Sequence, residues 1–517
     1  MSNIGNLIDQ AKKAEFRMPN EGELILANGR SYSMDCFSTQ RNNNVLIVGA
    51  SGTGKTRSIV TPNILQATGS YVISDPKGNL YTKYAGYLRK KGYDVKKIDF
   101  IHPEKSETYN FFRYIHSERD IIKAAHMLVY GNNNDQPRGN DPFWDQATEL
   151  YLSALISYLY EFRPESEQNL ASIGKLIKAT EINENSAAEK GPMDRIMEAV
   201  KRRNPDSFCV KQYDKFRVAA GKTLKSILIS TSALLAAIDT PEVEIMMGGK
   251  AKEPEEKIEV DLTKFQYDIE FDYKAEEMDE MEPEEGSEDE PDDISKILNE
   301  IKNDYEKEKA KEMIEEQRIL EESMFNFVNT DIDSIDLGGI GNKKTAVFVI
   351  VSDNDRSMDM LANLFFTQAM NELCLYADYK CENSRLPIPV RFILDDFATN
   401  VIIGDFPRII SSVRSRGISL MLCIQAEAQL EHAYGNDGRT IIGNCDNYVY
   451  MGGNDIETAY NVARRADVAE HRVLNMPVGV NWIFRRGEEP VMSRNFDIER
   501  FEDIKMNNRG CKLERLA

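Results

Sequence analysis

The feature that most constrains this chain is an octapeptide that follows a short apolar run. Residues 44–50 read NVLIVGA and residues 49–56 read GASGTGKT, which satisfies the pattern G-x-x-x-x-G-K-[ST]. The apolar, β-branched run predicts a strand, and residues 57–67 are compatible with a helix. Glycines at this spacing let the backbone curl until successive N–H groups point into one anion-sized hollow at a helix N-terminus. The segment therefore predicts a phosphate-binding loop between a strand and a helix of an α/β fold.

Two side chains of this loop carry its chemistry. The Lys55 ammonium can neutralise the β- and γ-phosphates, and the Thr56 hydroxyl is a hard oxygen ligand for Mg²⁺. We therefore expect ATP and Mg²⁺ as cofactors. The predicted ATP-binding residues are Gly49, Ala50, Ser51, Gly52, Thr53, Gly54, Lys55, Thr56 and Arg57.

A phosphate-binding loop alone hydrolyses nothing, so a second strand ending in a carboxylate is required. Residues 71–75 end at Asp75, and residues 389–394 are followed by Asp395 and Asp396. The second pair fits better: after an apolar run, Asp395 would hold Mg²⁺ through water, and Asp396 would polarise the attacking water. The alternative is a strand that merely ends in two solvated acids.

One more apolar run, residues 418–424, ends at Gln425. Ligands of α/β sheets bind outside the carboxyl ends of the strands. Gln425 is therefore predicted to contact the γ-phosphate or the attacking water.

Composition excludes several other classes. The chain has 517 residues and a formal net charge of −21, and this length predicts two to four folding units. Its seven cysteines are scattered without a C-x-x-C pair, and its five histidines show no H-E-x-x-H spacing, which argues against a disulfide scaffold and a metal centre. No apolar run approaches the ~20 residues that span a membrane. A cytoplasmic protein is expected.

Most of the negative charge lies in one segment. Residues 251–325 hold 29 Asp and Glu against 10 Lys and Arg, a net −19 of the total −21. Residues 275–293 are a low-complexity acidic stretch that cannot bury enough apolar surface to become ordered. Apolar residues then recur at helical spacing from residue 294 onward. We expect a disordered acidic linker followed by a charged helix, which acts either as a solvated spacer or as a docking arm for a basic partner.

Residues 118–237 are rich in helical periodicity. Bulky residues recur at three- to four-residue spacing: Trp144, Ala147, Leu150, Tyr151, Ala154, Leu155 and Tyr158. Such a stripe is typical of a helix core face, and a base-stacking platform is the alternative. Basic clusters at residues 201–203, 464–465 and 485–486 are either solvated faces or, repeated around a ring, phosphate contacts in a pore.

Several segments in this order resemble the type IV secretion coupling proteins of conjugation systems, the TraG/TraD-type DNA translocases. Besides the phosphate loop they are SDPKG (74–78), DPFWDQA (141–147), AAGKTLKSILIS (219–230), KKTAVFVIVSD (343–353), FILDDFAT (392–399), RSRGIS (414–419), IQAEAQLEHAYG (424–435) and NCDNYVYMGGND (444–455). The resemblance covers residues 40–245 and 330–500.

The resemblance implies a RecA-like P-loop ATPase with a mainly parallel central sheet, which assembles as a homo-hexamer around single- or double-stranded DNA. It would hand a relaxase-bound strand to the secretion channel, with ATP at residues 49–56, Asp395 organising Mg²⁺ and Gln425 as the γ-phosphate sensor. An arginine of a neighbouring subunit, Arg416 or Arg414, would complete the catalytic site.

Two departures from the family pattern stand out. Family members usually carry Glu after the metal-organising Asp, whereas this chain has Asp396, which is one methylene shorter. Hydrolysis is therefore expected to be slow or conditional. The usual N-terminal pair of membrane helices is not seen. Either the chain belongs to a soluble branch that docks on a membrane partner, or the helices have been trimmed from it; we expect the first, with contact with the membrane only through a partner, at the inner face of the cell membrane.

The domain boundaries follow from these features. We expect an N-terminal segment (1–40), a first part of the nucleotide-binding domain (41–117), an inserted all-α domain (118–237), a return to the nucleotide-binding domain (238–250), the acidic insertion (251–328) and the second part of the nucleotide-binding domain (329–517). Two other functions remain open: an ATP-binding receptor platform with little or no hydrolysis, and an FtsK/HerA-like DNA pump unrelated to secretion.

Overall fold

The computed structural model describes residues 8–131, 142–180, 190–248 and 334–507, except residues 10, 14, 220, 237 and 400. The acidic linker and charged helix predicted within residues 251–328 lie outside the described residues, as does Asp141 of the DPFWDQA segment.

The apolar runs form strands. The strands of the described residues are β1 (Glu23–Ala27), β2 (Arg30–Ser33), β3 (Val45–Val48), β4 (Ser70–Pro76), β5 (Asp94–Asp99), β6 (Thr345–Val351), β7 (Val390–Leu394), β8 (Ile418–Ile424), β9 (Asn447–Tyr450), β10 (Val480–Arg485) and β11 (Val491–Arg494).

All but β1 and β2, which pair with each other, join one sheet in the order β11-β10-β9-β3-β8-β7-β4-β6-β5. The seven strands from β9 to β5 are mutually parallel, and β10 and β11 continue the sheet antiparallel at one edge. The expected mainly parallel sheet is therefore confirmed. Its central strands are buried along their whole length, as parallel strands covered on both faces must be.

Alternate residues of each strand feed two separate cores. Leu46 and Val48 of β3 belong to the larger core, while Val45 and Ile47 belong to the smaller one on the opposite face. This division follows from the two-residue period of a strand.

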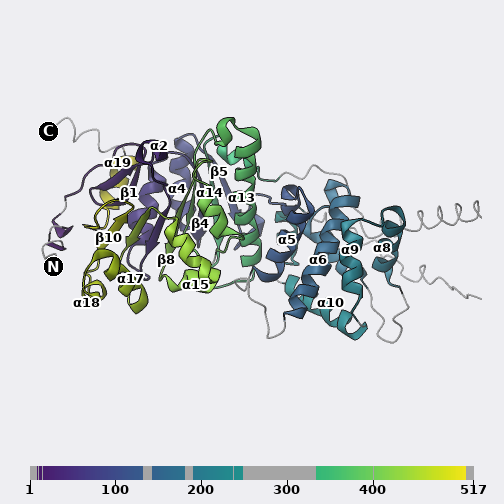
Figure 1. Cartoon of the computed structure of the whole chain (residues 1–517). Helices are drawn as coiled ribbons and strands as arrows, with labels where there is room; N and C mark the ends of the chain where they lie inside the picture. Colours follow the sequence, from purple (N-terminus) through teal and green to yellow (C-terminus); the bar gives the residue numbers. More distant parts are fainter. Residues whose placement is uncertain are drawn as a thin grey trace, which may run out of the picture.

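Helices cover both faces of the sheet (Figure 1). In the part of the chain that contains the sheet they are α2 (Cys36–Thr39), η1 (Thr56–Val60), α3 (Thr61–Leu65), α4 (Asn79–Lys90), η2 (Pro103–Lys105), η3 (Phe111–Tyr114), α11 (Pro241–Met246), η6 (Gly338–Gly341), α13 (Asp359–Lys380), η7 (Glu382–Ser384), α14 (Phe406–Ser412), α15 (Ala428–Tyr434), η8 (Gly435–Asp437), α16 (Gly438–Gly443), α17 (Ile456–Ala466), α18 (Glu470–Leu474) and α19 (Ile498–Asn507).

A second group of helices forms a lobe at one end of the molecule (Figure 1). Its members are α5 (Glu118–Tyr130), α6 (Phe143–Phe162), η4 (Glu165–Glu167), α7 (Leu170–Ala179), α8 (Pro192–Arg203), α9 (Phe208–Arg217) and α10 (Gly221–Leu235). The helix α5 packs against both α6 and α13, so it joins this lobe to the sheet. The strands β5 and β6 are neighbours in the sheet, so everything between residues 100 and 344 is an insertion between two paired strands.

The aromatic stripe of α6 is mostly core. Tyr151 and Tyr158 are fully buried, and the Tyr151 ring stacks on Phe216 with 4.4 Å between centroids. Trp144 differs, because it lies in the first turn of α6 and is 38% exposed. The core interpretation therefore holds for the tyrosines and not for the tryptophan.

Candidate nucleotide-binding site

The phosphate-binding loop leaves β3 at Gly49 and enters the helical turn η1 at Thr56. The backbone of Gly52 has φ +80° and that of Gly54 has φ +93°, values that L residues adopt at a cost. At Gly49 an added Cβ would lie 3.0 Å from the Met451 Cβ. Gly52 and Gly54 therefore meet a conformational demand of the loop, and Gly49 meets the close approach of Met451.

Lys55 is almost fully buried inside this loop. Its Nζ donates to the Gly49 carbonyl at 2.6 Å and to the Ala50 carbonyl at 3.3 Å. The Thr53 hydroxyl donates to the same Ala50 carbonyl at 2.9 Å. The ammonium is thus held inside the curl of the loop, where phosphate oxygens can replace carbonyl oxygens as its acceptors.

The contact that joins the two halves of the site runs from Thr56 to Asp395. The Thr56 Oγ1 donates to Asp395 Oδ2 at 2.5 Å, across 339 residues of sequence. Asp395 follows β7, and Thr56 belongs to the loop that follows β3. Because β8 lies between these two strands, the spacing of the sheet puts the backbones of β3 and β7 about 10 Å apart. Burial raises the pKa of the Asp395 carboxyl, and the hydrogen bond from Thr56 opposes that rise.

Asp396 has a left-handed backbone with φ +55°. Its carbonyl accepts from the Thr399 N–H at 3.3 Å, which closes a tight turn after β7. Among residues with a side chain, Asp and Asn tolerate this region best, because a short polar side chain can bond locally. The turn therefore offers a physical reason for Asp at a position where Glu was expected.

These groups surround a cleft of about 480 Å³ at the carboxyl ends of the strands. Its lining residues are Ser51, Gly52, Gly54, Lys55, Thr56, Arg57, Asp353, Asp395, Asp396, Thr399 and Gln425. Of the nine residues predicted to bind ATP, Gly49, Ala50 and Thr53 are not in this lining and shape the loop from behind.

Gln425 enters the cleft from the end of β8, between the strands that carry the loop and the acids. Its backbone N–H donates to Gln429 Oε1 at 2.6 Å, and the Gln429 amide donates in turn to the Thr399 hydroxyl at 2.8 Å. The turns after β7 and β8 are therefore tied to each other.

The sequence analysis missed three participants, namely Asp353, Thr399 and Asn495. Asp353 follows β6 and lines the cleft, and its carboxylate pairs with Lys77 at 2.6 Å. The Asn495 amide donates to the Thr53 carbonyl at 3.1 Å and so braces the phosphate loop. The signal for Asp353 was present, since it is a carboxylate directly after an apolar strand, but only the strand order brings that strand end to this edge.

Asp75, the weaker candidate for the second acid, has a different task. Its carboxylate accepts from the backbone N–H groups of Leu80 at 3.0 Å and Tyr81 at 2.7 Å, at the first turn of α4. Burial raises its pKa to about 6. It therefore caps a helix and does not line the cleft.

Arg414 and Arg416 precede β8, at the opposite end of the strands from Gln425. Seven residues of strand at about 3.3 Å each put them roughly 23 Å from the cleft of their own chain. The Arg416 guanidinium binds the Asp378 carboxylate through two bonds, of 2.8 and 2.7 Å, and Arg414 donates to the Cys36 carbonyl at 2.8 Å. The structure does not bring either arginine to the cleft of the same subunit.

The donor set of the cleft suits Mg²⁺. A buried carboxylate and a hydroxyl that already touch are hard oxygen ligands, the kind this ion prefers together with phosphate oxygens and water. Across the described ranges no group of three or more His, Cys, Asp or Glu is arranged to hold a metal ion unaided.

Two family models match the chain. Residues 4–248 match the model for conjugative DNA transfer of the type IV secretory system, and residues 389–471 match the model for the TraM recognition site of TraD and TraG. Together the two matches cover more than half of the chain. The chain belongs to the coupling proteins of conjugative type IV secretion.

The fold of this coupling protein is that of solved members. It superimposes on the bacterial conjugative coupling protein TrwBdeltaN70 in its unbound form with a TM-score of 0.54 at 13% identity, covering 95% of this chain and 90% of that one. The plasmid coupling protein TrwB in complex with ADP and Mg²⁺ matches with a TM-score of 0.54 at 13% identity, covering 95% and 92%. The predicted RecA-like P-loop fold is thereby confirmed. No curated protein matches the coupling protein in sequence.

Within the described residues, no helix of the coupling protein is both long enough and apolar enough to cross a membrane.

Proposed function

We propose that this coupling protein is an ATP-dependent translocase that moves relaxase-bound DNA, or another secretion substrate, into a type IV secretion channel. It would work as a homo-hexamer around sequence-nonspecific DNA and reach the inner face of the cell membrane only through a partner. The second family match, to a TraM recognition site, supports contact with a DNA-processing complex.

One observation carries this proposal, the 2.5 Å hydrogen bond between Thr56 and Asp395. A phosphate loop and an acid-ended strand that merely shared a fold could face different sides of the sheet. Their direct contact at the mouth of a 480 Å³ cleft supports one site for Mg²⁺ and a triphosphate.

The proposed roles follow from position and chemistry. Lys55 would neutralise the β- and γ-phosphates, and Thr56 and Asp395 would hold Mg²⁺, which supplies further charge neutralisation when bound. Asp396 would take a proton from the water that attacks the γ-phosphorus, as the bond to the ADP oxygen breaks. Gln425 would orient that water or the γ-phosphate from the end of β8.

The charge that develops on the γ-phosphoryl group calls for a further cation, and we propose that a neighbouring subunit supplies Arg416 or Arg414. Their distance from the cleft of their own chain is compatible with action across a subunit interface. Arg416 would first have to leave Asp378, so hydrolysis would depend on assembly.

A receptor platform that binds ATP without turning it over is the second candidate, and the backbone of Asp396 favours it. A short carboxylate on a left-handed turn reaches less far into the cleft than the usual Glu by about one C–C bond, and displacement of that order can cost about a hundredfold in rate.

Steady-state ATP hydrolysis with and without single-stranded DNA separates the two candidates. A translocase hydrolyses ATP, hydrolyses it faster when DNA is present, and loses this hydrolysis when Lys55 is replaced by Ala. The matched control is Lys77→Ala, which removes a cation at the rim that pairs with Asp353 and leaves the loop intact. No turnover with any DNA, despite measurable ATP binding, would favour the platform and reject the translocase.

A further inference from the structure

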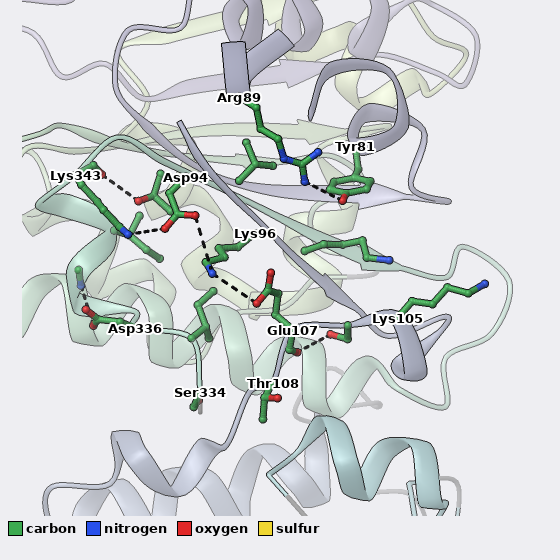
Figure 2. Close-up of a pocket in the computed structure, with 17 residues that line it drawn as sticks. Tyr81, Arg89, Asp94, Lys96, Lys105, Glu107, Thr108, Ser334, Asp336 and Lys343 are labelled. Carbon is green, nitrogen blue, oxygen red and sulfur yellow. Dashed lines mark hydrogen bonds and ion pairs between the residues drawn. The ribbon is translucent and has the colours of Figure 1, made fainter. Parts of the chain in front are cut away.

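A second cleft, of about 490 Å³, opens at the β5 edge of the sheet (Figure 2). Its walls come from α4, from β5 and the loop after it, and from residues 334–345. The strand β5 is three places from β7 in the sheet, so this cleft lies about 14 Å or more from the strand that ends at Asp395. It is separate from the nucleotide site.

The cleft is rich in cations. Five of its lining residues are basic, namely Arg89, Lys96, Lys97, Lys105 and Lys343, against three acidic ones. Figure 2 shows an ion-pair chain across it: Lys343 lies 2.5 Å from Asp94, and Lys96 lies 4.0 Å from Asp94 and 3.6 Å from Glu107.

Two of the cations have weak partners within the described residues. Arg89 donates to the Tyr81 hydroxyl at 3.2 Å and makes no ion pair with any described residue. Lys105 is 62% exposed and pairs with Glu104 across 3.8 Å, a surface contact of little strength. The rim of the cleft therefore carries positive charge that its local contacts offset only in part.

The described residues that flank the acidic segment in the sequence lie beside this cleft. The Tyr109 N–H donates to the Met246 carbonyl at 2.8 Å, and the Ile335 N–H donates to the Thr108 carbonyl at 2.9 Å. Ser334 itself lines the cleft. The described residues on either side of the acidic segment, up to residue 248 and from residue 334, thus lie within a few residues of the basic rim.

We propose that the basic cleft at β5 docks the acidic segment of its own chain, residues 251–328. The segment carries nearly all of the net charge of the protein, and its most acidic part starts 27 residues beyond residue 248. A chain of 27 residues has a root-mean-square reach of about 30 Å, and tethering on this scale gives effective concentrations near millimolar. Opposite charges so confined associate even when each single ion pair is weak.

The same charge argues against nucleic acid in this cleft. A tethered excess of 19 negative charges beside the rim repels phosphates and competes for the same cations. This inference is independent of ATP turnover. Its consequence is that any basic partner of the acidic segment must compete with the cleft.

Zero-length carbodiimide crosslinking of the full chain, read by mass spectrometry, tests the docking. We expect Lys96, Lys97 and Lys343 to crosslink to carboxylates of residues 251–328, and to do so within single chains in a mixture of ¹⁴N- and ¹⁵N-labelled protein. The reference lysine is Lys211 on α9, whose side chain is 52% exposed, within the range of the cleft lysines.

Reversing the two available cations, Arg89→Glu with Lys105→Glu, should lower these crosslinks about tenfold, because attraction becomes repulsion. Sodium chloride at 1 M, where the screening length is about 3 Å, should act in the same direction. The matched control reverses two exposed cations elsewhere, Lys178→Glu with Arg439→Glu, and should leave the crosslinks unchanged. Unaltered circular dichroism and ATP binding establish that both variants fold.

Three results would overturn the proposal. The cleft lysines could crosslink to the segment no more often than Lys211 does, the charge reversal could leave the yield unchanged, or the crosslinks could join different chains. Binding of a single-stranded oligonucleotide that is lost only in the cleft variant, with segment crosslinks unaffected, would assign the cleft to nucleic acid instead.

Discussion

Replacing Thr56 by Val isolates the hydroxyl that joins the two halves of the proposed nucleotide site. Valine keeps the branched shape and removes only the donor. In the native chain that donor serves a carboxylate, Asp395, that is nearly buried and whose pKa burial already raises. The variant leaves this carboxylate with one hydrogen bond fewer.

The magnitude follows from the charge of the acceptor. A hydrogen bond to a charged group contributes about 1.5–3 kcal/mol net, so we expect Thr56→Val to lower the free energy of unfolding by about 2 kcal/mol at pH 8. Losing the donor raises the pKa of Asp395 further above its unfolded value. A raised carboxyl pKa costs stability only above the unfolded pKa, so the loss should be smaller at pH 5 than at pH 8, because the ionised fraction of Asp395 falls as the pH falls.

Chemical denaturation at both pH values measures this, and binding of a fluorescent ATP analogue with and without Mg²⁺ measures the ligand role. Mg²⁺ should tighten binding to the native chain and to Thr56→Ser, which keeps the hydroxyl, and should fail to do so for Thr56→Val, with Kd at least about tenfold weaker. Equal behaviour of the Ser and Val variants, or an equal stability loss at both pH values, would refute the reasoning.

Three further predictions concern the surroundings of the cleft. Asp75→Asn should flatten the pH dependence of stability between about pH 4 and 6. The native chain loses stability as the pH rises through that window, because the pKa of Asp75 in the folded state is about 6. Calorimetry at pH 4.5 and 7 measures this, and an unchanged slope would contradict it. Asp396→Glu should raise ATP turnover about tenfold or more, because the longer side chain carries the carboxylate further into the cleft. It should also lower the free energy of unfolding by about 1 kcal/mol, because Glu fits the left-handed backbone less well than Asp. Steady-state kinetics and urea denaturation measure these two effects, and reduced turnover would count against the role of this acid. Arg416→Ala should abolish ATP turnover without weakening ATP binding, while Asp378→Ala should preserve turnover. If both variants lost the same share of turnover, the ion pair of Arg416 with Asp378 would be only structural.

Much of the nucleotide site could be predicted because its signals are local. The loop between residues 49 and 56 needs particular backbone angles at Gly52 and Gly54, and those needs are visible in a stretch of eight residues. The strands that end at Asp395 and Gln425 were visible for a related reason. Strands of a parallel sheet covered on both faces are continuous apolar runs, and polar residues at their carboxyl ends stand out.

Other parts of the site could not be predicted in this way. Asp353 lines the cleft only because its strand inserts between β4 and β5 in the sheet, and Lys77 meets it through that neighbourhood. Members of the two basic pairs are also engaged by carboxylates of the same chain. Arg465 lies 3.3 Å from Glu427, and Arg486 lies 3.0 Å from Asp446, so these guanidinium groups are bound within their own chain.

The sequence alone determined the phosphate loop, the acid-ended strand and the concentration of charge in one segment, because each depends on the order of neighbouring residues. Only the tertiary structure decided that Thr56 touches Asp395, that Asp396 sits on a left-handed turn, and that Met246 and Ser334, which flank the acidic segment in the sequence, lie beside a basic cleft. These facts depend on which strands pair, and pairing is selected by the burial of whole faces over hundreds of residues, a property that no short stretch of sequence contains.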